Sequence, residues 1–231
     1  GDVYKRQTHR QSKKRLLAYA NSQLSKALDI NTLTIGFARR AATYKRAQLI
    51  FKDVDRLIDI GKGKIQIIFS GKAHPKDEGG KSLIKNIVKS SKYFTGHIKI
   101  IYLENYNMWL GRLITSGVDV WLNTPLRPNE ASGTSGMKAS LNGVPNLSVL
   151  DGWWSEGCID GVNGWAVGNP NEISDESDAD HLYNLIENNV IPSYYGDKDD
   201  WSTMMKESIK TGISYTSHRM VTDYNNQYYK L

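Results

Sequence analysis

The chain of 231 residues is long enough to form one large domain or two small ones with a substantial core. With 39% hydrophobic residues, 23% charged residues and 6 prolines, it has the composition of a globular protein and not that of a disordered, collagen-like or coiled-coil chain. The single cysteine, Cys158, excludes a disulfide-stapled miniprotein, and no His/Cys cluster has the spacing of a metal site, so no metal is expected.

The formal net charge of +6 is unevenly distributed, with basic side chains crowding the first fifteen residues and acidic ones gathering over 172–180. No nucleic-acid reader motif accompanies this charge, so a nucleic-acid partner is not expected. No apolar stretch approaches the roughly 18 to 20 residues of a membrane span, and no signal peptide is recognisable. We expect a cytoplasmic protein with no membrane partner, and the start at Gly1, directly before a helical pattern, suggests a piece of a longer protein.

The predicted elements alternate between helices and short strands. Apolar residues spaced as in a helix, followed by β-rich runs of four to seven residues, give this assignment. The predicted strands are 33–38, 64–70, 98–103, 118–123, 146–150 and 164–167. The predicted helices are 8–29, 43–61, 78–92, 106–116, 134–142, 177–190 and one from about 199 to the end.

This alternation predicts an α/β fold, a Rossmann-like parallel sheet with helices on both faces. In such sheets, ligands bind at the carboxyl ends of the strands, where loops meet helix N-termini. The loops that follow residues 38, 70, 103, 123 and 150 are therefore the candidates for a functional site. The aromatic residues beyond residue 190 are expected to pack rather than to take part in chemistry.

The loop after the first strand, GFARRAATYKRAQL, carries Arg39, Arg40 and Lys45 beside a predicted helix start near Thr43. Guanidinium groups bind phosphate in a bidentate manner, and a helix N-terminus adds positive potential, so this segment is a candidate anion site. A solvated basic helix start fits the same residues equally well. The segment alone does not decide between the two.

The next two loops carry weaker signals. SGKAHPKDEGGKS does not have the register of an ATP-cradling loop, because Pro75 stands where that motif needs glycine. In LENYNMWLG, Glu104 and Asn105 are predicted to cap the following helix. Tyr106 would face either the cleft or the core.

The fourth loop, NTPLRPNEASGTSGMKASLNG, concentrates chemically useful side chains at a strand-to-helix turn. Small residues let backbone amides approach a ligand closely, and amides at a helix N-terminus suit phosphate. Lys138, one turn into the helix, is a candidate Schiff-base lysine if it is partly desolvated, whereas an ordinary Gly/Ser loop with a surface lysine is the alternative. The candidates occupy nine consecutive positions: Glu130, Ala131, Ser132, Gly133, Thr134, Ser135 and Lys138 among them.

These loops resemble those of a known family. EASGTSGMK at 130–138 is similar to the pyridoxal phosphate lysine motif of the α-glucan (glycogen, starch, maltodextrin) phosphorylases, in which the last lysine carries the cofactor. Three further segments agree with the family in order and spacing: ARRAATYKR at 38–46, GKAHP at 71–75 and LENY at 103–106. The resemblance runs from about Thr8 to Gly168, and Arg39-Arg40 is similar to the short, unregulated bacterial and archaeal branch.

The resemblance implies a role for each matching residue. Lys138 would carry pyridoxal 5'-phosphate, Tyr106 would flank it, and Lys138, Arg40 and Lys45 would be the catalytic residues. The other implied contacts are those of Thr134, Ser135 and Arg39 with the cofactor phosphate, of Arg40 and Lys45 with the substrate phosphate, and of Glu130, Ala131, Ser132 and Gly133 with glucose.

The implied reaction is reversible phosphorolysis of terminal α-1,4-glucosyl units to α-D-glucose 1-phosphate with retention, in which the cofactor phosphate acts as acid and base. The partners would be α-1,4-glucan and inorganic phosphate. The sequence departs from regulated glycogen phosphorylases at Ala42-Thr43 and Ser135-Gly136, where they have His-Glu and Gly-Asn, so phosphorylation or AMP control is not expected.

The family's fold has two facing nucleotide-binding-like domains, and this chain can hold only the C-terminal one. We expect 1–30 to lead in from a missing N-terminal domain of the same chain, 31–172 to bind cofactor and phosphate, and 173–231 to add C-terminal helices that pack on the domain. The fragment would be inactive alone. Its oligomeric state stays open, a homo-oligomer included.

Two other functions compete with this interpretation. A nucleotide-sugar glycosyltransferase of the glycogen or starch synthase type would use a similar basic pair and a similar glutamate, but it needs no lysine at position 138. A non-enzymatic glucan-binding module would use the tryptophans, since aromatic faces stack on sugars, although core packing explains them equally well. Asp151 and Glu156 are expected to cap or brace their loop rather than to catalyse.

Overall fold

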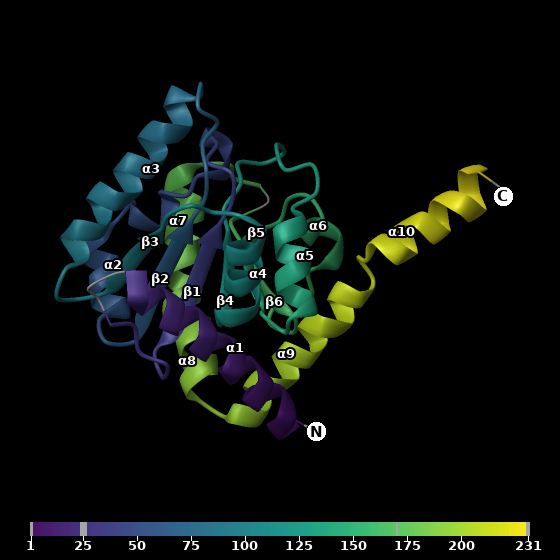
Figure 1. The fold of residues 1–231 in the computed structure, drawn as a ribbon, viewed down its shortest axis with the longest axis horizontal. Coiled ribbons are helices and arrows are strands. Elements are labelled where there is room, and N and C mark those ends of the chain that lie inside the picture. Colours follow the sequence, from purple (N-terminus) through teal and green to yellow (C-terminus); the bar gives the residue numbers. More distant parts are fainter. Residues whose placement is uncertain (1, 24–26, 170, 230–231) are drawn as a thin grey trace.

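The computed structural model describes residues 2–23, 27–169 and 171–229, and its centre is one sheet of parallel strands (Figure 1). The strands run in the order β3-β2-β1-β4-β5-β6, and every pairing is parallel. This is the strand order of the Rossmann fold, so the predicted fold class is confirmed. The strands are β1 (Leu33–Ala38), β2 (Ile65–Ser70), β3 (Lys99–Leu103), β4 (Val120–Asn123), β5 (Asn146–Val149) and β6 (Gly164–Val167).

Side chains alternate across the strands, which places apolar residues on both faces of the sheet. In β2, Ile67 and Phe69 enter the core on one face, whereas Ile68 enters the core on the other. In β4, Trp121 points away from Leu122 in the same manner. Because both faces are covered, these strands read in the sequence as continuous apolar runs, which is why their bounds were predictable to within two residues.

Helices cover both faces of this sheet (Figure 1). The core that includes Leu16, Leu110 and Ala139 belongs to α1, α4 and α5 on one face. The core on the other face includes residues of α2, α3, α7, α8 and α9. The helices are α1 (Asp2–Gln23), α2 (Val54–Gly61), α3 (Glu78–Ser90), α4 (Met108–Gly117), α5 (Thr134–Leu141), α6 (Trp154–Gly157), α7 (Asp175–Leu185), α8 (Ile191–Tyr195), α9 (Lys198–Ile213) and α10 (Ser217–Tyr224).

The predicted helix 43–61 is confirmed only over its last part, Val54–Gly61 (α2), and is wrong before it. The segment forms two short 3-10 turns, Thr43–Lys45 and Leu49–Phe51, before α2 begins. Arg46 has a left-handed backbone with φ 45°, which interrupts any α-helix at that point. The side chain of Asp53 then accepts a hydrogen bond from the Arg56 N–H and caps α2. The helix N-terminus expected beside Arg39 and Arg40 is therefore a single 3-10 turn.

Other bounds also differ from the prediction. The first helix begins at Asp2 and is described as far as Gln23, residues 24–26 lie outside the described part, and residues 27–29 are not helical. Asn107, and not Glu104 or Asn105, caps α4, because its side chain accepts the Leu110 N–H and Asn105 has a left-handed φ of 58°.

The C-terminal helix predicted from residue 199 onward is broken into α9 and α10, which is followed by a π-helical turn at Asn225–Tyr229. Among the aromatic residues of this region, Trp201 is buried, but Tyr224, Tyr228 and Tyr229 are exposed, so the expected packing is wrong for these three. The α10 segment projects away from the sheet and its helices (Figure 1). Among the described residues, no helix combines the length and apolarity of a transmembrane span.

Candidate functional site

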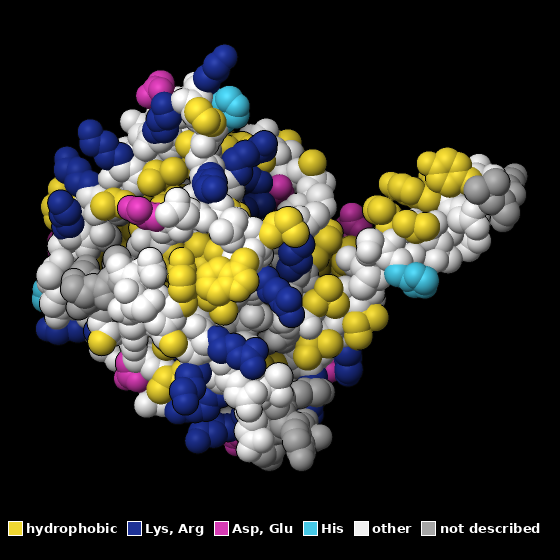
Figure 2. Space-filling view, viewed as in Figure 1, with side chains coloured by type: hydrophobic (Ala, Val, Ile, Leu, Met, Phe, Trp, Pro, Cys, Tyr) yellow, Lys and Arg dark blue, Asp and Glu magenta, His cyan; other side chains and the backbone are white. Residues whose placement is uncertain are grey.

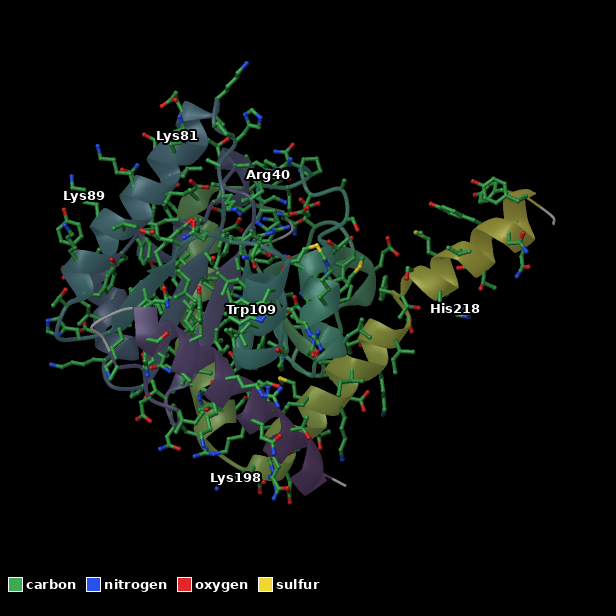
Figure 3. All side chains as sticks on the ribbon, in the orientation of Figure 1. Arg40, Lys81, Lys89, Trp109, Lys198 and His218 are labelled. Carbon is green, nitrogen blue, oxygen red and sulfur yellow. The ribbon has the colours of Figure 1, made fainter. Side chains whose placement is uncertain are left out.

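The strand order places a crevice between β1 and β4. The chain leaves β1 toward β2 on one side and leaves β4 toward β5 on the other, so the two following loops diverge and leave space between them. Figure 3 shows Arg40, on the loop after β1, toward the upper end of the molecule. Figure 2 shows Lys and Arg side chains gathered over the same part of the molecule.

All the site residues predicted from the sequence line one pocket of about 450 Å³ at this crevice. That volume lies in the range of small-molecule sites. The pocket brings together segments that are about ninety residues apart in the chain. Its predicted members are Arg39, Arg40, Lys45, Tyr106, Glu130, Ala131, Ser132, Gly133, Thr134, Ser135 and Lys138.

A buried ionic cluster joins the two loops inside the pocket. Arg39 Nη2 lies 2.7 Å and Lys45 Nζ lies 2.6 Å from the same Glu130 Oε2. All three side chains are less than 10% exposed. Burial alone would raise the pKa of the Glu130 carboxyl, but the hydrogen bond from Lys45 and the charge of Arg39 outweigh burial and hold that pKa below its ordinary value. The cluster carries two cations and one carboxylate, so it retains one net positive charge.

Two glycines let the backbone form the walls of this pocket. Gly133 has φ +91°, a left-handed conformation that favours glycine, and it caps the start of α5. A Cβ at Gly71 would lie 2.1 Å from the carbonyl oxygen of Arg39, so only glycine allows the loop after β2 to pass behind the Arg39 backbone. The GKAHP segment thus supports the site without lining it.

The Asp151 carboxylate fixes the loop after β4 through hydrogen bonds to its backbone. Its Oδ2 accepts the Glu130 N–H at 2.9 Å and its Oδ1 accepts the Gly152 N–H at 3.0 Å. The Trp153 N–H also donates to the Ser132 carbonyl oxygen at 2.9 Å. The expectation that Asp151 braces its loop is confirmed.

The sequence reasoning missed Arg46, which ties the two loops together from the core side. Its Nε donates to the Thr124 carbonyl oxygen at 3.0 Å and its Nη2 to the Pro125 carbonyl oxygen at 2.9 Å. The same guanidinium pairs with Asp178 of α7 at 2.5 Å, and Asp178, which is fully buried, also pairs with Arg127 at 3.1 Å. The sequence gives no signal for this contact beyond the presence of an arginine, because its partners lie far away in the chain.

The polar groups of the pocket fit a phosphorylated cofactor. Arg39 Nη1 and Ser135 Oγ are both buried, and neither has a hydrogen-bond partner in the part of the chain that the structure describes. Buried donors of this kind are almost always satisfied, so a phosphate group at this position would complete their hydrogen bonding. Lys138 lies in the same pocket and on the same helix, α5, three residues after Ser135.

Lys138, Thr134 and Arg40 are exposed on the open side of the pocket. The condition of partial desolvation is therefore not met at Lys138 in the described part of the chain. Tyr106 is half buried, and burial raises the pKa of its phenol while the nearby Arg39 lowers it. The ring of Tyr106 thus lies at the wall of the pocket.

A Rossmann-like sheet with a basic pocket at its topological switch point is typical of domains that bind phosphorylated ligands. The profile of the family described as carbohydrate phosphorylase matches residues 4–156 of the sequence. The chain therefore belongs to the carbohydrate phosphorylase family.

Curated relatives agree with this assignment. The chain is 51% identical to the maltodextrin phosphorylase of Thermococcus litoralis over 87% of this chain and 25% of that protein. It is 48% identical to the glycogen phosphorylase of Aquifex aeolicus (87% of this chain, 31% of that protein) and 43% identical to that of Mycobacterium tuberculosis (89% and 25%). The chain thus spans between a quarter and a third of the length of these relatives.

Proposed function

We propose that the chain is the C-terminal part of an α-glucan phosphorylase, a glycosyltransferase that transfers terminal α-1,4-glucosyl units reversibly to inorganic phosphate. The product would be α-D-glucose 1-phosphate, formed with retention. The observation that carries this proposal is the grouping of Arg39, Arg40 and Lys45 with Glu130 and Lys138 in one pocket. We place the reaction in the cytoplasm.

The cofactor would be pyridoxal 5'-phosphate, whose phosphate exchanges a proton with the substrate phosphate when bound. Lys138 would hold the cofactor covalently, and Tyr106 would lie along its ring. The unpartnered donors of Arg39 and Ser135, together with Thr134, would hold its phosphate.

The two remaining cations would hold the substrate phosphate. Arg40 is exposed at the mouth of the pocket, and Lys45 is buried beside it against the ring of Tyr44, with Nζ 4.6 Å from the ring centroid. The Glu130 carboxylate would accept hydrogen bonds from glucose hydroxyls, and the backbone of residues 131–133 would donate hydrogen bonds to them through N–H groups and accept through carbonyl oxygens. In this arrangement, Glu130 fixes the positions of both Arg39 and Lys45 before any ligand binds.

The pocket is open on one side, and we propose that a preceding domain of the same protein covers it. This domain would supply the rest of the glucan site and would exclude water from the reacting atoms. The 231-residue chain alone is then expected to bind phosphate but not to turn over glucan.

Borohydride trapping tests the proposed role of Lys138. The protein is incubated with limiting pyridoxal 5'-phosphate, reduced and digested, and the phosphopyridoxyl group is located by mass spectrometry. We expect Lys138 to be labelled in large excess over exposed lysines such as Lys81 and Lys89 (Figure 3). The Ser135→Ala and Arg39→Gln variants should lose this selectivity, because they remove the phosphate donors and leave the amine in place.

The main alternative is a nucleotide-sugar glycosyltransferase, which would use the same basic crevice on a donor diphosphate. Labelling spread evenly over the exposed lysines, together with saturable binding of UDP-glucose or ADP-glucose, would favour this alternative over a phosphorylase. The position of Lys138 inside the pocket favours the phosphorylase, since the alternative needs no lysine there.

A further inference from the structure

A second pocket lies at the amino-terminal ends of the strands, whereas the candidate active site lies at their carboxyl ends. It has a volume of about 460 Å³ and lies among α1, α8, α9 and the start of β4. Asp119, which directly precedes β4, and Lys13 of α1 are among its lining residues. We call it the amino-edge pocket, because the strands begin at this edge and the phosphorylase site lies where they end.

The base of the amino-edge pocket is a buried ionic network. Lys13 Nζ lies 2.5 Å from Asp119 Oδ2 and 3.0 Å from the Tyr194 hydroxyl, and His9 Nε2 lies 3.0 Å from Asp119 Oδ1. The Thr34 N–H donates to the same carboxylate at 2.8 Å. Because Asp119 is fully enclosed by these donors, its charge is already neutralised and does not repel an anion in the pocket.

Further basic groups line the pocket and are not neutralised in this way. Within the described residues, Arg10 and Lys198 have no carboxylate partner, and Arg10 donates to the amide oxygen of Asn31 at 3.2 Å. His9 and Arg6 are not among these groups, because His9 pairs with Asp119 and Arg6 pairs with the exposed Asp199.

The pocket also has an aromatic wall. The rings of Tyr194 and Trp201 pack edge to face with centroids 5.2 Å apart, and both residues line the pocket. Figure 3 shows Lys198 at the lower end of the molecule, far from Arg40 at the upper end. The combination of unneutralised cations and an apolar wall matches a ligand that has an anionic group and a compact organic part.

We propose that the amino-edge pocket is a second ligand site that binds a small organic phosphate monoester. Arg10 and Lys198 hold the phosphate, and the organic part lies against Tyr194 and Trp201. A phosphate dianion suits several donors that lack carboxylate partners, and the pocket volume exceeds what an inorganic phosphate ion fills. The site does not depend on the proposed catalytic function.

Calorimetric titration with ribose 5-phosphate, inorganic phosphate and ribose tests this site in the purified protein. We expect saturable binding of ribose 5-phosphate, weaker binding of inorganic phosphate and none of ribose. The Arg10→Gln/Lys198→Gln double variant should bind ribose 5-phosphate at least about tenfold more weakly, since two charge-assisted contacts are lost. Both substituted side chains lie outside the buried Lys13–Asp119 pair, so folding should be retained.

Two control variants separate this site from other sources of binding. The Lys85→Gln/Lys89→Gln variant removes the same charge from the exposed face of α3 and should bind like the wild type. The Arg40→Gln variant changes the phosphorylase pocket and should retain the binding at the amino-edge pocket. The proposal is overturned if the Arg10/Lys198 variant binds like the wild type, if Arg40→Gln removes all binding, or if inorganic phosphate binds to the Arg40→Gln variant as tightly as ribose 5-phosphate does.

Discussion

At the scale of single residues, the main feature of the crevice is the Glu130 carboxylate, which already provides a negative charge to the two cations that would bind a phosphate. Its carboxylate lies within 2.7 Å of both Arg39 and Lys45, which are buried and can hardly be left without a negative partner. A phosphate that enters the pocket must therefore share these cations with Glu130. The strength of phosphate binding should depend directly on the charge at position 130.

We expect Glu130→Gln to destabilise the protein by about 3–5 kcal/mol, because it leaves two buried cations without a counter-charge. The same variant should gain more stability from added phosphate than the wild type does, since phosphate replaces the missing charge. Thermal unfolding in phosphate and in chloride at equal ionic strength measures both effects.

The exposed Glu187 offers a matched control for this measurement. Glu187→Gln should change neither the melting temperature nor its response to phosphate. An equal phosphate response in Glu130→Gln and in the wild type would contradict the interpretation that Glu130 and phosphate compete for the same cations.

Asp119 leads to a prediction about acid stability. Burial would raise the pKa of its carboxyl, but the charge of Lys13 and the hydrogen bond from His9 outweigh burial and lower that pKa. In the unfolded chain the pKa of an aspartate is about 3.9. The charged Asp119 therefore stabilises the folded protein fully above that pH, and this stabilisation is lost as the pH falls through the lower pKa of the folded state. We expect Asp119→Asn to be less stable at pH 7 and to show a shallower loss of stability below about pH 4.

Urea unfolding between pH 2.5 and pH 7 measures this dependence. Asp197→Asn is a suitable comparison, because Asp197 is exposed and caps α9 by accepting the Asp199 N–H. Its acid profile should follow that of the wild type. If Asp119→Asn lost stability with acid as steeply as the wild type, the charge of Asp119 would not be the source of the effect.

At the scale of elements, the sequence predicted the strands well and one loop badly. The strands are predictable because burial on both faces requires continuous runs such as IQIIFS, whose pattern is local. The segment 43–61 has helical spacing, but the left-handed Arg46 is held by the carbonyl oxygens of Thr124 and Pro125, nearly eighty residues away. A contact of this kind overrides local propensity and leaves no local signal.

The pair of Arg46 and Asp178 links the loop after β1 to α7, while Arg127 links the loop after β4 to the same carboxylate. We expect Asp178→Asn to lower the free energy of unfolding by about 3–5 kcal/mol, because the buried Arg127 guanidinium loses its pair with Asp178 and the buried Arg46 keeps only the half-exposed Asp175. It should also weaken phosphate binding, since both walls of the crevice depend on this carboxylate. Urea unfolding and phosphate titration check the two effects.

Asp180, on the same helix, provides the control. Its side chain is 63% exposed and pairs with Arg56 at the surface, so Asp180→Asn should cost less than about 1 kcal/mol. Similar losses in the two variants would show that the burial of Asp178 is not what makes its pair important.

At the scale of the whole molecule, the grouping of the site residues follows from topology. The rule that ligands bind at the carboxyl ends of parallel strands narrowed the sequence to five loops, and those after residues 38, 103 and 123 line the pocket. The family resemblance selected the candidate residues within them. The amino-edge pocket could not be predicted in this way, because α1, α8 and α9 meet there only through tertiary packing. The exposure of Lys138 could not be predicted from the sequence either, because it depends on which segments cover the pocket.

The projecting C-terminal segment leads to the last prediction. In the described part of α10, no residue is buried, and Met220, Val221 and Tyr224 are each between 47% and 59% exposed. We therefore expect deletion of residues 217–231 to change the free energy of unfolding by no more than about 0.5 kcal/mol, since none of the described residues 217–229 belongs to either core. The deletion keeps Tyr215, whose ring packs on Trp153. Met205→Ala in α9 is the control, because Met205 is 3% exposed and its truncation should cost about 2–5 kcal/mol. Urea unfolding of both variants measures the difference, and a large loss in the deletion variant would mean that α10 packs on the domain in solution.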